Sequence, residues 1–393
     1  NQTGDAITVT GATRLSTNGS GEVDLDEPTG NDFGGFEAVA TGHAVRVADD
    51  DGIALGVIDA DTLTVTAGGS VTDTAAMTVP NAVRITATTT AAAPSITLDA
   101  VDGDATDGHA FGAAVTLSAT GAGAAGGDVT LDETGDILLG GVTAGAFTAR
   151  VAEGAIGGIT DDAPVLASGA VSLVARGGAQ DVILDLAAND FGGPVSVVVD
   201  AGRTVTLRDA NALTLGNVAA PGAPAGTVTL DLGTDLVADG GAAQAAGTGV
   251  FANQIDLIVR ETPAGGRASA ALAGDADTLT ASAAGAAVAF EDADGLVLGQ
   301  VDADSLTLQL GGALTQAFLT GIRDSAGGDG AALDVTAFDA GSGTAFDVTL
   351  TSVDLSFNPL NDFAAGGVSV VGNAVQLLDP NAIGLVNSRA ASS

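Results

Sequence analysis

The segment Gly52-Ile-Ala-Leu-Gly-Val-Ile-Asp-Ala-Asp-Thr-Leu-Thr-Val65 returns much later in the chain as Gly295-Leu-Val-Leu-Gly-Gln-Val-Asp-Ala-Asp-Ser-Leu-Thr-Leu308. The alignment between residues 29–66 and 272–309 needs no gap. A chain that copies itself at a fixed register is built from stacked supersecondary units. The pattern therefore predicts a repeat protein, and it favours a function carried by a long surface over a single buried active site.

Two shorter anchors show that the repeating unit measures about 80 residues, so three units separate the two long copies. A Leu-Gly pair recurs at nearly even steps, at Leu55-Gly56, Leu139-Gly140, Leu215-Gly216 and Leu298-Gly299. A second anchor recurs as Asn31-Asp32-Phe33-Gly34-Gly35, Asn189-Asp190-Phe191-Gly192-Gly193, a weakened Asn361-Asp362-Phe363 and a worn His109-Ala110-Phe111-Gly112. The anchors lie in residues 31–56, 111–140, 189–216, 274–299 and 361–371.

Local composition indicates an all-β chain. Short runs rich in β-branched residues, such as Val171–Val174 and Val195–Val199, are separated by Gly, Asp, Asn and Ser. This is typical of strands and turns, and no helical apolar stripe persists among the 58 glycines. Stacked sandwich domains are the alternative, but they usually hold a buried aromatic anchor, and Trp and Tyr are absent.

An elongated parallel β-helix, or β-solenoid, fits the pattern better. Each repeat would hold three or four coils of about 20–27 residues, with Val, Ile, Leu and Ala stacked inward. We expect residues 1–378 to form one continuous solenoid and residues 379–393 to form a C-terminal tail.

Charge limits the possible partners. The chain has 49 acidic and 11 basic residues, all of them arginine, for a net charge of −38, yet 46% of its residues are hydrophobic. Nucleic acid and anionic membrane are poor partners for such a surface, whereas cations are suitable ones. The sequence has no cysteine, which removes disulfides and thiol chemistry and is compatible with an exported bacterial protein. No apolar run is long enough to predict a membrane span.

The repeat resembles those of filamentous-haemagglutinin-like adhesins, which are large exported proteins of Gram-negative bacteria. The resemblance rests on Asn-Asp-Phe-Gly-Gly followed by Val205-Thr-Leu-Arg-Asp-Ala-Asn-Ala-Leu-Thr-Leu-Gly-Asn-Val218. It implies a right-handed parallel β-helix and a location outside the cell or on its surface. The amino-terminal secretion domain of that family is not evident in this sequence.

Acidic turns are the candidate metal sites. Ca²⁺ prefers several oxygen ligands from carboxylates and turn carbonyls, which nominates Asp49, Asp51, Asp102, Asp104, Asp107, Asp292 and Asp294. The alternative is that Asp simply favours turns and solvated edges. No cluster completes an EF-hand, so weak collective binding of cations is the broader expectation.

The Asn-Asp-Phe-Gly motif is interpreted as a structural corner rather than a ligand loop. We expect Asn or Asp to satisfy the turn backbone, Phe to fill the core and Gly to take a positive φ. The residues concerned are Asn31, Asp32, Phe33, Gly34, Asn189, Asp190, Phe191, Gly192, Asn361, Asp362 and Phe363.

An enzyme is not expected. Acidic pairs are too abundant for their spacing to indicate glycoside hydrolysis, and the aromatic platforms of sugar sites are missing. The absence of lysine excludes Schiff-base chemistry. The two histidines, His43 and His109, lie far apart in the sequence and are expected at turns or on the surface.

The leading functional hypothesis is therefore an extracellular fibre subunit that polymerises head to tail with itself. Open β edges at the ends of a solenoid favour such stacking, and without lysine it must be non-covalent. One alternative is the stalk of a large secreted adhesin that holds a host or cell-surface glycan or protein. Another is a surface-layer lattice that requires calcium.

Overall fold

The computed structural model confirms an all-β fold of parallel coils. It describes residues 2, 5–17, 21–27, 30–90, 93–99, 108–121, 126–152, 155–178, 180–219, 224–233, 241–245, 247–260, 269–325, 331–339, 344–351, 361–379 and 389–390. All secondary-structure elements within these ranges are β-strands. A search of the same residues finds no helix with the length and apolarity needed to cross a membrane.

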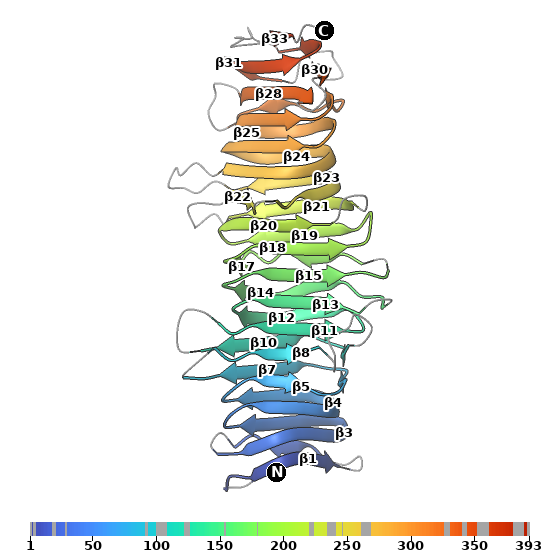
Figure 1. Cartoon of the computed structure of the whole chain (residues 1–393), viewed down its shortest axis with the longest axis vertical. Helices are drawn as coiled ribbons and strands as arrows, with labels where there is room; N and C mark the ends of the chain where they lie inside the picture. Colours follow the sequence, from blue (N-terminus) through green and yellow to red (C-terminus); the bar gives the residue numbers. More distant parts are fainter. Residues whose placement is uncertain are drawn as a thin grey trace. The chain divides into compact units, whose positions relative to one another are not determined.

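The chain divides into two compact units, unit 1 (Asn1–Asp200) and unit 2 (Ala201–Ser393), and many of their strands are labelled in Figure 1. Unit 1 contains β1 (Thr8–Ser16), β2 (Val23–Leu25), β3 (Asp32–Asp49), β4 (Ile53–Ala67), β5 (Val71–Asp73), β6 (Thr78–Val79), β7 (Val83–Thr88), β8 (Ile96–Leu98), β9 (Ala110–Phe111), β10 (Val115–Thr120), β11 (Val129–Glu133), β12 (Ile137–Ala144), β13 (Phe147–Val151), β14 (Ile159–Ala167), β15 (Val171–Ala175), β16 (Val182–Leu184), β17 (Asp190–Phe191) and β18 (Val195–Val199). Unit 2 contains β19 (Thr204–Asp209), β20 (Ala212–Val218), β21 (Ala225–Leu232), β22 (Gly241–Gln244), β23 (Val250–Val259), β24 (Ser269–Asp292), β25 (Leu296–Leu310), β26 (Leu314–Gln316), β27 (Ile322–Arg323), β28 (Ala331–Asp339), β29 (Thr344–Ala345), β30 (Val348–Leu350), β31 (Phe363–Gly372), β32 (Val375–Leu377) and β33 (Arg389–Ala390).

Within each unit, strands pair in parallel with the equivalent strands of the neighbouring coils. One column of paired positions in unit 1 passes through seven coils, at Ile53, Val71, Ile96, Val129, Phe147, Val171 and Val195. In unit 2 a similar column runs through Val205, Val228, Ile255, Leu279 and Leu298. The described exception is the short antiparallel pair of β28 and β29.

Coil length varies more than the sequence suggests. The pairing of Ile53 with Val71 closes a short coil, whereas the pairing of Ile96 with Val129 closes one almost twice as long. A coil of similar length in unit 2 separates Leu333 from its partner Val368. The expected coil of about 20–27 residues is therefore too narrow a range. Extra residues between strands do not disturb the pairing of the strands themselves.

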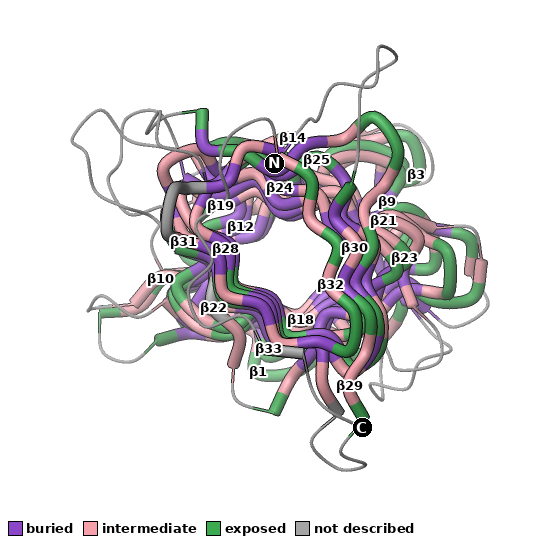
Figure 2. The backbone as a smooth tube through the Cα atoms, turned by 90° about the horizontal axis from the view of Figure 1, so that it is seen from above, coloured by how far each residue is buried: buried purple, intermediate pink, exposed green. Residues whose placement is uncertain are grey.

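The core of each unit consists of small and branched side chains at every second strand position. In β15, Val171, Leu173 and Ala175 are buried and the residues between them are partly exposed. Figure 2 shows the same alternation along the coils, with buried positions in purple and exposed turns in green. Each such side chain packs on its counterpart one coil away, so burial of apolar surface holds neighbouring coils together at the spacing of a parallel sheet.

Buried asparagines form three of the described corners of the coils. The Oδ1 atoms of Asn31, Asn189 and Asn361 accept backbone hydrogen bonds of 2.9, 2.8 and 3.0 Å. The donors are the amides of Ile7, Val165 and Ile322, which lie in the preceding coil. A polar side chain of an earlier coil accepts from each Asn Nδ2 in turn, namely Gln2, Asp161 and Gln316. Two residues after each Asn, the side chains of Phe33, Phe191 and Phe363 are buried in the core.

A second hydrogen bond ties these corners to the far end of the coil. The Phe33 amide donates to the Asp49 carboxylate at 2.7 Å, and the Phe363 amide donates to Asp379 at 2.6 Å. In each case the acceptor lies 16 residues after the donor. Each of these carboxylates therefore accepts the backbone amide hydrogen of a corner phenylalanine.

The expected positive φ at the motif glycines is wrong. Neither Gly34 nor Gly192 has a positive φ. Glycine is required there for space, because a Cβ on Gly34 would lie 2.8 Å from the Thr10 carbonyl oxygen and one on Gly192 would lie 3.0 Å from that of Ser168. The close approach of neighbouring coils thus explains these glycines better than turn geometry does.

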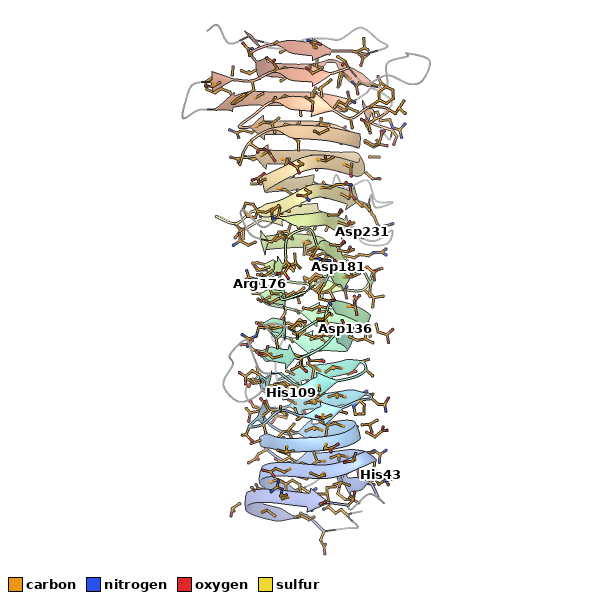
Figure 3. The ribbon with its side chains drawn as sticks, turned by 90° about the vertical axis from the view of Figure 1, so that its right-hand side faces the viewer. His43, His109, Asp136, Arg176, Asp181 and Asp231 are labelled. Atoms are coloured by element: carbon orange, nitrogen blue, oxygen red, sulfur yellow. The ribbon has the colours of Figure 1, made fainter. Side chains whose placement is uncertain are left out.

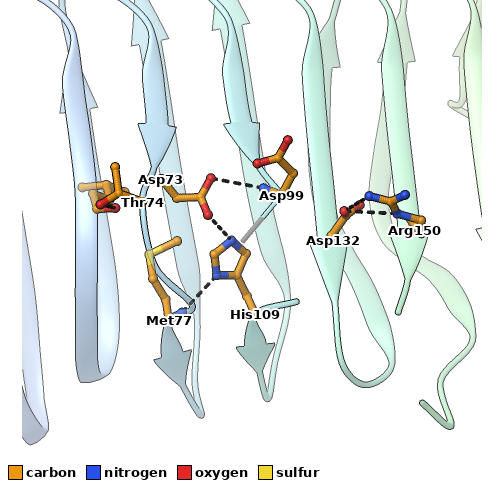
Figure 4. Close-up of polar contacts among 8 residues, drawn as sticks. Asp73, Thr74, Met77, Asp99, His109, Asp132 and Arg150 are labelled. Carbon is orange, nitrogen blue, oxygen red and sulfur yellow. Dashed lines mark hydrogen bonds and ion pairs between the residues drawn. The ribbon is translucent and has the colours of Figure 1, made fainter. Parts of the chain in front are cut away.

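His109 was expected at a turn or on the surface; it lies at a corner, but the expectation of a surface position is wrong because His109 is fully buried. It occupies the Asn position of the corner, where its Nδ1 accepts the Met77 amide at 3.0 Å (Figure 4). Its Nε2 lies 3.4 Å from the Asp73 carboxylate, and its ring stacks on Phe111. The degenerate copy of the motif, which begins at His109, therefore forms the same kind of corner as the asparagine copies. The other histidine, His43, is partly exposed in β3 (Figure 3).

The proposed boundary at residue 378 stays a prediction. Within the expected tail of residues 379–393, Arg389–Ala390 forms β33 and pairs in parallel with Val371–Gly372 of β31. The remaining tail residues, apart from Asp379, lie outside the described residues.

The corner geometry predicts different outcomes for two substitutions of His109. His109→Asn should fold with nearly the stability of the parent, because Asn can accept the Met77 amide and donate to Asp73 as Asn189 donates to Asp161. His109→Leu leaves the Met77 amide unpaired and should lower the free energy of unfolding by about 1–3 kcal/mol. Urea denaturation followed by circular dichroism measures both. Equal losses for Asn and Leu would show that the hydrogen bond contributes nothing.

Candidate functional site

Three carboxylates come together at one acidic turn of unit 2. Asp275 lies in the first part of β24, Asp292 ends that strand, and Asp294 lies in the turn before β25. One oxygen from each lies within 4.8 Å of the other two. Asp292 is buried, whereas Asp275 and Asp294 are exposed. The group is therefore open to solvent on the side of Asp275 and Asp294.

Asp292 is the structural centre of this group. Its carboxylate accepts the Ala276 amide at 2.9 Å and the Asp294 amide at 3.0 Å, and is thus the unit 2 counterpart of Asp49. The pKa of Asp292 is raised to about 7: burial is the largest cause, the two amides oppose it, and the Asp294 side chain adds to the rise. Burial, with Asp294 and Asp277, also raises the pKa of Asp275. Close to neutral pH, a proton therefore neutralises part of the charge of the group.

The equivalent turn in unit 1 keeps the same corner. Asp49 accepts the amides of Phe33 and Asp51 at 2.7 and 3.1 Å. Burial raises the pKa of Asp49 to about 6. Within the described residues, however, the only group of three potential ligands is the one in unit 2.

The sequence analysis selected four of the described carboxylates as candidate metal ligands, and it did not select a fifth, Asp275. It selected Asp49, Asp51, Asp292 and Asp294 as turn residues, and the structure brings the last two together with Asp275. Asp275 aligns with Asp32 in the long repeat, so the repeat register contained the signal, but Asp32 was interpreted only as part of the corner motif. The nominated Asp102, Asp104 and Asp107 lie outside the described residues.

The arrangement could hold a hard cation or a proton. Three monodentate carboxylates supply fewer oxygens than the six to eight that Ca²⁺ takes, so backbone carbonyls or water would have to complete a calcium site. Two of the three side chains are solvent-exposed, which makes the group a weak, surface-type site rather than an enclosed one.

A second titratable group is enclosed in unit 1. Glu133 is fully buried at the end of β11, and neither carboxylate oxygen accepts a hydrogen bond of normal geometry. Burial raises the pKa of Glu133 to about 9; Asp136 adds to the shift and the nearby Phe111 amide opposes it. Next to it, burial raises the pKa of Asp132 while its ion pair with Arg150 opposes the rise (Figure 4). These groups are inaccessible to a substrate, and Glu133 is protonated at neutral pH.

Removing one charge from the acidic turn should stabilise the protein in the absence of divalent cations. Asp275→Asn relieves repulsion with Asp294, which solvent screens, and should raise the Tm in chelator by about 1–2 °C. Asp334→Asn, on the exposed face of β28, is the matched control. Calorimetry with EDTA and with calcium distinguishes the roles. If the variant had a lower Tm than the parent in EDTA, repulsion between Asp275 and Asp294 would be contradicted. If its Tm fell below that of the parent only in calcium, Asp275 would be identified as a calcium ligand.

Glu133 should make the protein less stable as pH rises. The folded-state pKa of about 9 exceeds the ordinary value of 4.5. The contribution of Glu133 to folding stability is therefore fully present below pH 4.5 and is lost as pH rises through 9. Glu133→Gln keeps the shape, cannot ionise, and should remove a slope of up to about 1.4 kcal/mol per pH unit. Urea unfolding at pH 5, 7 and 9 measures the difference between the two proteins. Parallel pH profiles would contradict the assignment.

One known family of repeats is similar to the first half of the chain. The family described as "Repeats of unknown function (DUF5649)" matches residues 1–40, 42–122 and 126–198. The second and third of these matches each cover one sequence repeat of about 80 residues, the length that the anchors predict. No curated protein and no solved structure matches the chain. The resemblance to filamentous-haemagglutinin-like adhesins has no counterpart in these matches. Residues 1–198 are thus similar to the repeats that this family describes.

Proposed function

We propose that this chain is a structural protein of the bacterial exterior whose copies associate non-covalently into a fibre. The observation that supports the proposal best is the in-register parallel stacking of coils in each unit, such as the seven-coil column that begins at Ile53. Parallel coils bind one another through backbone hydrogen bonds and matching apolar columns, and both are independent of which chain supplies the next coil.

The composition supports a location outside the cell. A net charge of −38 keeps single copies soluble and apart at low ionic strength, and salt weakens this repulsion. The chain lacks cysteine and therefore has no thiols to oxidise. The resemblance to filamentous-haemagglutinin-like adhesins favours the same location. The absence of lysine excludes lysine-dependent covalent assembly, so the fibre we propose forms without cross-links.

A structural role also accounts for the buried titratable groups. His109 holds a backbone amide of the preceding coil and faces Asp73, both within the core. Glu133 is enclosed in the same way. We therefore assign these residues to coil packing rather than to catalysis.

A calcium-dependent surface lattice is the second candidate, and the acidic turn at Asp275, Asp292 and Asp294 favours it. A cation there would neutralise charge on the outside of unit 2 and could bridge neighbouring copies. A stalk segment of a longer adhesin that binds a glycan or protein would share the coil architecture and remain monomeric.

Negative-stain electron microscopy of the purified chain, at low and physiological salt and with or without EDTA, distinguishes these functions. We expect filaments that lengthen with salt, because screening reduces repulsion, and that survive EDTA. Two-dimensional sheets that dissolve in EDTA would establish the lattice instead. Separate short particles under all conditions would overturn assembly and favour the stalk.

A further inference from the structure

One of the four described corners has an acceptor that can take up a proton. Asn31, Asn189 and Asn361 accept through amide oxygens, which do not titrate. His109 instead accepts the Met77 amide through Nδ1 at 3.0 Å. Imidazole is the side chain that ordinarily gains and loses a proton between about pH 5 and 8. This copy of the repeat therefore has a titratable group where the three others have none.

The bond to Met77 fixes the protonation state of the ring. Nδ1 can accept the Met77 amide only while it carries no proton, so the imidazole is neutral and its single proton lies on Nε2. Nε2 points to the Asp73 carboxylate, 3.4 Å away, and both side chains are fully buried (Figure 4). A second proton would have to bind Nδ1, where it would face the hydrogen of the Met77 amide. Two donors would then meet where one hydrogen bond existed.

Carboxylates beside the ring would attract a positive charge on it. Asp73 lies on β5, and its second oxygen accepts the amide of Asp99, an acidic residue of the next coil, at 3.2 Å. Asp132 lies on β11, interacts electrostatically with His109 and pairs with Arg150. Protonation of the ring therefore exchanges the corner hydrogen bond for an ion pair with Asp73.

The other described neighbours of the ring add no charge at neutral pH. Phe111 stacks on the imidazole, with ring centroids 5.1 Å apart. The backbone of His109 pairs with that of Glu133. Glu133 is protonated near neutral pH, because burial raises its pKa to about 9. Mild acid can therefore change the charge of the ring, whereas Glu133 already holds its proton.

The Met77 amide holds a segment that has few other bonds to the His109 coil. Met77 directly precedes β6, which is two residues long and pairs with β9, also two residues long. Besides the bond to Nδ1, the amides of Ala110 and Gly112 donate at 2.9 Å to the carbonyls of Met77 and Val79. Loss of the bond to Nδ1 thus removes one of the few hydrogen bonds that join β6 to the next coil.

We propose that His109 makes its corner acid-sensitive: as pH falls below neutral, the imidazolium remains paired with Asp73 and releases the Met77 amide. The segment that contains β6 then loosens within unit 1, while the bonds to the three corner asparagines persist. This device belongs to the fold of a single chain, so it does not depend on the proposed assembly.

NMR of the full-length, ¹⁵N-labelled protein between pH 8 and 5 tests the proposal. The imidazole nitrogen signals report the protonation of His109, and amide exchange reports the protection of Met77 after correction for intrinsic exchange. The amides bound by the asparagine corners, Ile7, Val165 and Ile322, are internal references. His43→Asn removes the only other histidine, so that the remaining imidazole signals belong to His109. His109→Asn replaces the titratable acceptor with the acceptor of the other corners.

We expect the protection of the Met77 amide to fall about tenfold or more as His109 takes up its second proton, because a hydrogen bond of the corner is lost. The three reference amides should change little, and Met77 should stay protected in His109→Asn. Imidazole signals that remain those of a neutral ring down to pH 5 would overturn the proposal. So would protonation of His109 without a change at Met77, or an equal loss of protection at Met77 in His109→Asn.

Discussion

Four described corners of this structure depend on a buried side-chain acceptor, Asn31, His109, Asn189 or Asn361, that holds a backbone amide of the preceding coil. Apolar columns attract neighbouring coils but specify their register weakly, because valine packs on leucine or alanine almost equally well. The bond from Val165 to Asn189 is directional, so it fixes which residue of one coil lies over which residue of the next. A slip by two residues, which would keep the apolar side chains facing the core, would leave both groups buried and unpaired, at a cost of about 1–3 kcal/mol each.

The same corner explains why the repeat tolerates such variable coil lengths. Phe33 fills the core and Asp49 satisfies its amide, while the residues between strands can change in number without altering either contact. It also explains why the acidic residues of the corners are not all solvated. The carboxylates of Asp49 and Asp292 bind amides in a buried position, which gives an acidic chain a small set of carboxyl groups that hold protons near neutral pH.

Much of the fold could be predicted from the sequence, because the features that determine it are periodic. Alternating apolar residues and the repeated Asn-Asp-Phe motif indicated β-strands arranged in parallel coils. The structure confirms the strands and their parallel pairing. Coil lengths could not be predicted, since residues between strands follow no period. The sequence placed His109 in a worn copy of the motif, but its burial was not predicted, because a histidine was not recognised as an acceptor equivalent to asparagine. The motif glycines were explained by φ, when contact between coils is the actual constraint. Asp275 was missed for a related reason: its partner Asp292 is distant along the chain and becomes adjacent only after the coil closes.

The most direct test of this account is amide hydrogen exchange, measured by NMR on the folded protein, at Ile7, Met77, Val165 and Ile322. In the structure these amides donate to side chains rather than to strand carbonyls. If the corners hold the coils in register, the four amides should be protected to nearly the same degree as strand amides of the adjacent coils, because they open only when the coils separate. Exchange at the rate of exposed turn amides would contradict the account and would leave apolar packing as the determinant of register.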